Sequence, residues 1–152
     1  MIMKEDTTTS SLGFFLAKSS RILTSKTDHL FKKAGLPFSF EQWMVLSCLN
    51  EKGGQSQQAL SNLTGRDKTT MTRMINGLQK RNLVLRVPGK FDKRNKQIYL
   101  TQKGSQVYQE LNLLATRVFE HFTKDLDEKD VDLCKNILQK TFGLKEQMID
   151  YE

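Results

Sequence analysis

Apolar residues recur at helical spacing over the first part of the chain. Between residues 10 and 33 they fall three or four positions apart, which predicts a long amphipathic helix. Ser10 or Ser11 is placed to cap its first turn, and the stretch from Ala34 to Pro37 ends it. The apolar positions expected on this helix are Leu12, Phe15, Leu16, Ile22, Leu23, Leu30 and Phe31.

Three shorter helices are predicted next. The first runs from its N-cap at Ser39 to about Asn50, and Ser56 opens a second that ends near Gly65. Asp67 is placed to cap a third over residues 68–81. The left-handed position after this helix suits an Asn, the residue at position 82, because Asn tolerates a positive φ.

The pattern then changes to short runs of β-branched and large apolar residues, which predict strands at Val84–Val87 and Gln97–Thr101. The connection between them is long, polar and basic. Thr101 caps a following helix to about Thr123, and Asp127 starts a last helix that extends to residue 147. The predicted fold is therefore mainly α, with a small two-stranded antiparallel β-wing. Three helices followed by a wing are typical of a winged helix-turn-helix lobe.

Composition narrows the class of protein. A chain of 152 residues with 38% hydrophobic content is expected to fold as a single domain over residues 1–152. It has no apolar run near the roughly 20 residues that span a bilayer, and no signal-peptide pattern at its start. Two cysteines, Cys48 and Cys134, favour a reducing cytoplasm, and both are expected to be free, buried thiols because they share helix faces with apolar neighbours.

The positive charge is concentrated in one segment. Residues 66–97 contain ten Lys or Arg and two acidic residues, a balance of +8, whereas the whole chain carries +7. The remainder therefore sums to −1. This distribution indicates a surface that binds a polyanion such as a nucleic acid.

The helix at 68–81 has two different faces. Met71, Met74, Ile75 and Leu78 cluster on one side, and hydroxyl, amide and cationic side chains cluster opposite. A face with small polar side chains near its start and long cations beside them suits the major groove of DNA. The predicted DNA-binding residues are Lys68, Thr69, Thr70, Thr72, Arg73, Asn76 and Lys80 on this helix, and Lys90, Asp92, Lys93, Arg94 and Lys96 on the wing.

Within the wing, Arg94 is the candidate for insertion into a narrow minor groove, whose negative potential attracts a guanidinium. Asp92 lies two residues away and would repel phosphate if it were unpaired. We therefore expect Asp92 to hold the Arg94 side chain by hydrogen bonds rather than to contact DNA.

These segments resemble the MarR family of transcription regulators. The resemblance rests on TxTR at Thr70–Arg73, KRxLVxR at Lys80–Arg86, DxR at Asp92–Arg94 and LTxxG at Leu100–Gly104, in this order and spacing. The chain departs from the usual pattern with Asn82 in place of a Gly, with Ala59–Leu60 in place of Leu-Ala, and with no acidic residue at Gln79 or Leu85.

The resemblance implies a homodimer that binds a pseudo-palindromic operator, with recognition helices about one DNA turn, roughly 34 Å, apart. Helices over 10–33 and 102–147 would form the dimerisation region, and residues 39–101 the DNA-binding lobe. Such proteins typically repress transcription and are released by a small aromatic or anionic effector. The candidate pocket residues are Phe15, Phe38, Phe40 and Trp43, although aromatic residues at helical spacing more often belong to an ordinary core.

Other functions fit the sequence less well. An enzyme would need a catalytic constellation, and the chain has neither a Gly-rich phosphate loop nor a nucleophile elbow. His29 and His121 are isolated, so neither a metal nor another cofactor is expected. A non-specific architectural DNA-binding or RNA-binding protein could use the same basic surface. The helix at 68–81 lacks the outward aromatic residues on which single-strand and RNA binders commonly stack bases.

Overall fold

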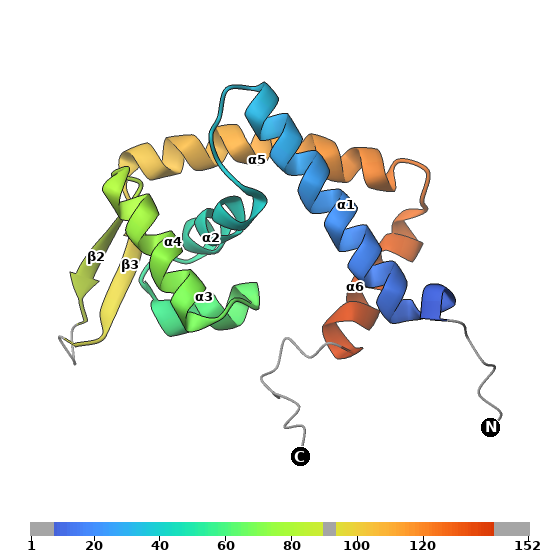
Figure 1. The fold of residues 1–152 in the computed structure, drawn as a ribbon, viewed down its shortest axis with the longest axis horizontal. Coiled ribbons are helices and arrows are strands. Elements are labelled where there is room, and N and C mark those ends of the chain that lie inside the picture. Colours follow the sequence, from blue (N-terminus) through green and yellow to red (C-terminus); the bar gives the residue numbers. More distant parts are fainter. Residues whose placement is uncertain (1–7, 90–93, 142–152) are drawn as a thin grey trace, which may run out of the picture.

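The computed structural model describes residues 8–89 and 94–141 (Figure 1). Most of the described chain is helical. A small antiparallel sheet combines one short strand from between the second and third α-helices with two strands from between the fourth and fifth. The elements are η1 (Thr8–Ser10), α1 (Leu12–Lys33), α2 (Phe40–Glu51), β1 (Gln55–Ser56), α3 (Gln57–Thr64), α4 (Lys68–Lys80), β2 (Val84–Pro88), β3 (Lys96–Leu100), α5 (Gln102–Thr123) and α6 (Glu128–Thr141). The mainly helical fold with a β-wing is confirmed.

The starts of five helices follow from their capping residues. In each case the side chain at the N-cap accepts a hydrogen bond from the backbone N–H three residues later, which satisfies a donor that the helix itself leaves unpaired. The second cap is reciprocal, because the Gln42 side chain also accepts from the backbone N–H of Ser39. The five caps are Ser11, Ser39, Ser56, Asp67 and Thr101.

The sheet contains one strand more than the sequence predicted. Its order is β1-β3-β2, and β1 pairs with β3 through Gln55 opposite Ile98 and Ser56 opposite Gln97. The Gly54 N–H also donates to the Ile98 carbonyl at 2.9 Å. A strand of two residues is too short to produce a period-2 pattern. The interpretation as a two-stranded wing was therefore incomplete.

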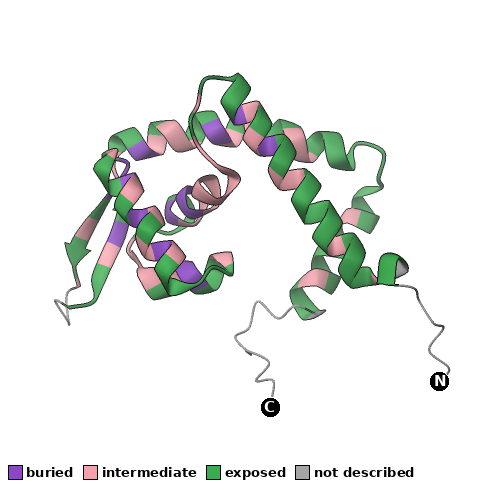
Figure 2. Ribbon diagram, viewed as in Figure 1, coloured by how far each residue is buried: buried purple, intermediate pink, exposed green. Residues whose placement is uncertain are grey.

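The core lies where the C-terminal part of α1, helices α2–α4, the sheet and α5 meet (Figure 2). Phe31 is fully buried there, at the α1–α5 crossing. By contrast, α6 has no buried residue among the side chains that the structure describes. Its Cys134 is exposed, so the expectation of a buried thiol at this position was wrong for the single chain. The fully or nearly buried apolar residues are Phe31, Val45, Leu46, Leu49, Leu60, Met71, Ile75, Leu78, Leu83, Val84, Ile98, Leu111 and Ala115.

A tight junction joins the wing to α5. Asn82 has φ of 59°, and its carbonyl accepts from the Thr101 hydroxyl at 2.7 Å. The Thr101 N–H donates to the Leu83 carbonyl at 3.0 Å. Gly104 lies so close to that same carbonyl that an added Cβ would stand 1.9 Å from the oxygen. The LTxxG segment therefore has a structural role, which is to bring the start of α5 against the base of the wing.

In Figure 1, α5 runs along the top of the molecule, with the α2–α4 lobe and the wing below one end and α6 below the other. Helix α1 crosses α5 and descends on the α6 side. No helix in the described part of the chain has the length and apolar character needed to cross a membrane.

Candidate nucleic-acid interface

Helix α4 has the two faces that its sequence predicts. Met71, Ile75 and Leu78 are buried in the core. The opposite side of the helix carries five exposed residues that we call the outward face, namely Lys68, Thr69, Arg73, Asn76 and Lys80. Thr70 and Thr72 are half-buried beside it. Packing therefore presents amide, hydroxyl and cationic groups on one side of a rigid helix.

Asp67 and Thr70 fix the start of this helix. The Asp67 carboxylate accepts from the Thr70 N–H at 2.9 Å and from the Thr70 hydroxyl at 2.6 Å. Hydrogen bonds to the charged form stabilise it, so the pKa of Asp67 lies below its ordinary value. The Thr70 hydroxyl proton is thus used within the protein, and Thr70 orders the helix terminus.

A polar network joins α4 to α3 and to the wing. The Gln57 side-chain amide donates to the Thr72 hydroxyl at 2.6 Å, and that hydroxyl donates to the Lys68 carbonyl at 2.8 Å. From β2, Arg86 donates to the amide oxygens of Asn76 at 2.8 Å and Gln57 at 3.1 Å. It also donates to the amide oxygen of Gln79. Arg86 therefore bridges three side chains on two helices.

Sequence reasoning missed Gln57, Gln79 and Arg86 as members of this site. Arg86 stands in the KRxLVxR motif, but a motif does not say which side of a strand a residue occupies. Its contacts arise because β2 runs back along α4 after the turn at Asn82. The predicted positions on α4 all lie on or beside its outward face.

On the wing, Arg94 and Lys96 are exposed. Lys90, Asp92 and Lys93 lie outside the described residues, so the pairing of Asp92 with Arg94 stays a prediction. Lys96 begins β3 and pairs in register with Pro88 at the end of β2. Lys96 thus stands at the last paired row of the β2–β3 hairpin, and Arg94 precedes the strand.

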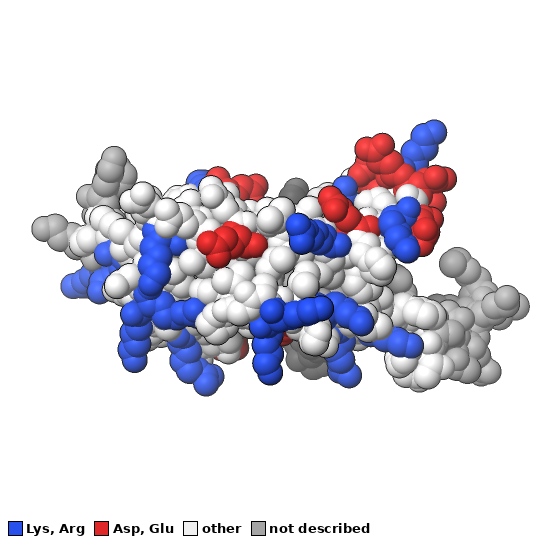
Figure 3. Space-filling model, turned by 90° about the horizontal axis from the view of Figure 1, so that it is seen from above, with Lys and Arg blue, Asp and Glu red and all other residues white. Residues whose placement is uncertain are grey.

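The charges are spread unevenly over the surface. Figure 3 shows Lys and Arg side chains along one long edge of the molecule, and most of the acidic side chains visible in this view at one end. That end belongs to the α5–α6 connection and the first turns of α6, whose acidic residues are Asp125, Asp127, Glu128, Asp130 and Asp132. The acidic end is remote from α4 and the wing. A polyanion is therefore attracted to the lobe rather than to α6.

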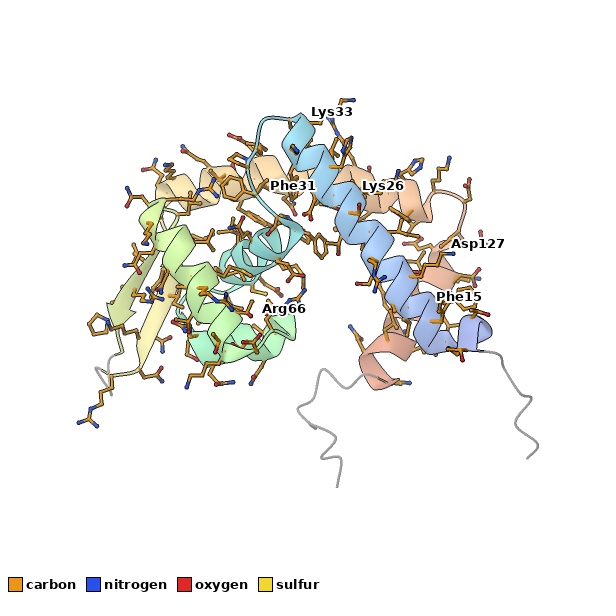
Figure 4. All side chains as sticks on the ribbon, viewed as in Figure 1. Phe15, Lys26, Phe31, Lys33, Arg66 and Asp127 are labelled. Atoms are coloured by element: carbon orange, nitrogen blue, oxygen red, sulfur yellow. The ribbon has the colours of Figure 1, made fainter. Side chains whose placement is uncertain are left out.

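The four aromatic candidates for a ligand pocket do not gather in one place. Phe40 and Trp43 lie 5.3 Å apart, centre to centre, and both contact Phe119 of α5. Phe38 lies under the guanidinium of Arg81, 3.8 Å from its ring centre. Phe15 is 54% exposed, at the α6 end of the molecule (Figure 4). Only Phe40 and Trp43 thus form a common cluster.

A cleft of about 690 Å³ separates α1 from the α2–α4 lobe. Its walls include Arg21 and Asp28 of α1, Phe40 and Glu41 of α2, and Arg66 from the α3–α4 connection. Of the four aromatic candidates, which all lie in the described chain, Phe40 lines this cleft and the other three do not. The cleft combines an aromatic ring with two cationic and two acidic side chains.

One ion pair crosses the lobe at the edge of this cleft. The Arg66 Nε donates to a carboxylate oxygen of Glu41 at 2.7 Å, and a second guanidinium nitrogen donates to the other oxygen. This pairing raises the pKa of Arg66, chiefly through the hydrogen bond. Arg66 directly precedes the N-cap of α4, so the pair ties the start of α4 to α2. Figure 4 shows Arg66 on the side of the lobe that faces α1.

Neither thiol nor metal chemistry has support at this site. Cys48 is half-buried, and its pKa is raised by burial and then by the charge of Glu51, which disfavours the reactive thiolate. Within residues 8–89 and 94–141 no cluster of three His, Cys, Asp or Glu side chains could hold a metal ion. The chemistry offered is hydrogen bonding and charge.

The helical lobe, the wing and the outward face of α4 define a winged helix-turn-helix DNA-binding protein. The sequence model of the MarR family matches residues 38–96, which span this lobe almost completely. Over this lobe the chain therefore matches the MarR family of transcription regulators.

The chain is similar to a regulator with an assigned role and to structures with bound molecules. The chain is 28% identical over 144 residues to the HTH-type transcriptional regulator SarZ of Staphylococcus haemolyticus, covering 93% of this chain and 97% of SarZ. The repressor CouR, solved with a 23-mer DNA duplex, has a TM-score of 0.77 at 23% identity, covering 92% and 98%. NadR in complex with 4-hydroxyphenylacetate has a TM-score of 0.79 at 21% identity, covering 95% and 100%. At these identities the two structures show the fold alone.

Proposed function

We propose that this protein is a sequence-specific repressor that binds a pseudo-palindromic operator as a homodimer and is released by a small effector. The observation that carries the proposal is the outward face of α4, with Arg73 and Asn76 exposed on a helix that the core holds rigidly. Arg is suited to guanine edges and phosphates, and the N-terminus of the helix favours a phosphate. Duplex DNA in the cytoplasm is the partner that fits these groups.

The unpartnered apolar side chains of α6 support a homodimer. Leu133 is 57% exposed and Ile137 46% exposed on an amphipathic helix without a buried residue in its described part. A single helix of this length is marginally stable in water, so it requires packing against something. Leu12, Phe15 and Ile22 on α1 are also exposed. A second copy of the chain would cover both helices at once and would set the spacing of the two α4 helices.

The cleft beside Arg66 supports release by an effector. A small aromatic acid would find the Phe40 ring, the cations Arg21 and Arg66, and a volume within the usual range of ligand sites. The nearby indole N–H of Trp43 is buried and has no hydrogen-bond partner within the described chain. A ligand carboxylate would compete with Glu41 for Arg66. That competition would loosen the start of α4 and lower DNA affinity.

Fluorescence anisotropy tests the proposal. Labelled duplex from upstream of the protein's own gene and a scrambled duplex of equal composition are titrated across a range of salt concentrations. A regulator binds its operator about a thousandfold or more tightly than the scrambled duplex. Light scattering on the same samples gives the mass of the free protein and of the complex. Failure to bind any duplex would refute the proposal.

The alternative is a non-specific architectural DNA-binding protein, favoured only by the concentration of positive charge. The same titration separates the two, because an architectural protein binds both duplexes equally and with a steep salt dependence. Of the relatives named above, SarZ is a transcriptional regulator and CouR a transcriptional repressor.

A further inference from the structure

On the side of the lobe that carries the outward face, more hydrogen-bond donors than acceptors are left available for a ligand. The side-chain oxygens of Gln57, Thr72, Asn76 and Gln79 all accept hydrogen bonds from within the protein. Of the other side chains on the outward face, Lys68, Arg73 and Lys80 have only donors, and the Thr69 hydroxyl can donate or accept. The Arg73 guanidinium has no hydrogen-bond partner in the described part of the chain. Three of the four oxygens are engaged by one residue, Arg86.

The orientation of the Asn76 amide follows from chemistry alone. Arg86 has only donors, so the group of Asn76 that it contacts at 2.8 Å must be the oxygen. The nitrogen, with two hydrogens, is then the group left for a base. An Asn that reads adenine needs both its oxygen, for the adenine amino group, and its nitrogen, for N7. Here the oxygen already lies against a cation.

The charge of Arg86 strengthens this constraint. Its three acceptors in the described chain are amides, so no carboxylate hydrogen-bonded to Arg86 there offsets its positive charge. An adenine amino hydrogen that approached the second lone pair of the Asn76 oxygen would meet this charge and be repelled. Guanine presents two acceptors, N7 and O6, at the same place in the major groove. A donor beside a cation therefore favours guanine.

On the basis of the proposed operator binding, we infer that Arg86 is a positioning residue that sets the base preference of Asn76, for guanine and against adenine. Arg86 acts from the wing strand without contacting the base. The residue that touches DNA is Asn76, and its preference depends on which way Arg86 turns the amide.

The test measures base preference at each operator position. Competition anisotropy with the full-length protein and a panel of duplexes, each with one base pair changed, gives the relative affinity for all four bases. The position read by Asn76 is the one at which Asn76→Ala makes the four bases equivalent. There the wild-type protein binds guanine about tenfold more tightly than adenine.

Arg86→Met removes the guanidinium and keeps an unbranched stem. We expect the guanine-to-adenine ratio to fall about tenfold at the Asn76 position and to stay unchanged elsewhere. Arg86→Leu, which also removes the charge and the donors, should shift the ratio in the same direction and serves if the Met variant does not fold. The double variant with Asn76→Ala should show no change beyond Asn76→Ala alone. Arg81→Met is the matched control, because Arg81 contacts Phe38 and Pro37 instead.

Two results would overturn the inference. The first is a uniform loss of affinity across all sequences with a salt slope smaller by about one, which would make Arg86 a phosphate contact. The second is an unchanged ratio at the Asn76 position. A wild-type protein with no preference between operator and scrambled duplex would instead overturn the proposed function, and the inference with it.

Discussion

Replacement of Gly104 by Ala tests the junction between the wing and α5. An added Cβ would stand 1.9 Å from the Leu83 carbonyl oxygen, whereas ordinary contact begins at 3.4 Å, so the backbones would have to separate by about 1.5 Å. The carbonyl cannot turn aside easily because it also accepts from the Thr101 N–H at 3.0 Å. Overpacking of this kind costs about 1–3 kcal/mol.

Gly77→Ala in α4 is the matched control. It is also a Gly within a helix, and an added Cβ there would meet no atom within 4 Å. Both substitutions gain about 1 kcal/mol from helix propensity. We therefore expect Gly77→Ala to raise the melting temperature by about 2–4 °C. Gly104→Ala should lower it by up to about 8 °C, the value reached when the overpacking cost lies at the upper end of its range.

Circular dichroism at 222 nm, with heating and with urea, measures both variants at one fixed protein concentration, since association affects the melting temperature. The free energy of unfolding of Gly104→Ala should lie below that of Gly77→Ala by the cost of the contact alone. Equal stabilities of the two variants would refute the reasoning, because they would mean that the close approach to Leu83 carries no free energy.

Three further predictions concern single groups. Arg94→Ala should weaken DNA binding at every sequence and reduce the salt slope by about one, measured by anisotropy, and an unchanged slope would place Arg94 away from the phosphates. The pKa of Asp67 is lowered in the fold, so its stabilising effect is present above the ordinary Asp pKa, about 3.9, and is lost as pH falls through the lower folded value. Asp67→Asn keeps a good N-cap and should remove this acid-dependent part in urea titrations at pH 7 and pH 3, whereas identical pH dependence would contradict the assignment. Cys48 should react with a disulfide reagent more slowly than exposed Cys134, with a rate still rising above pH 9, and faster reaction of Cys48 would contradict its raised pKa.

The helices were predictable because their signals are local. A capping residue such as Ser39 or Asp67 marks the start of a helix to within one turn. Apolar residues at helical spacing, such as Met71, Met74, Ile75 and Leu78, indicate which face of the helix is buried. Asn82 was predictable as a left-handed residue for the same reason. Each of these depends on positions close together in the chain.

The features that escaped prediction depend on residues far apart in the chain. Arg86 meets Gln57 across 29 positions, and Arg66 meets Glu41 across 25. Strand β1 exists only because β3 lies beside it. The exposure of Cys134 could not be predicted from the sequence either. A helix with apolar spacing buries its apolar face only when another element packs against it. Spacing shows which residues share a face, but tertiary packing decides what that face contacts.

The length of α5 has a mechanical consequence. Its 22 residues extend about 33 Å, from the base of the wing to the connection with α6. Gly104 holds one end tightly, so the helix and the wing should tilt together as a lever. A tilt of roughly 5° at the far end would displace the wing by about 3 Å, a distance sufficient to break hydrogen bonds to base edges. Modest changes of angle near α6 would therefore be amplified into a change of register on DNA.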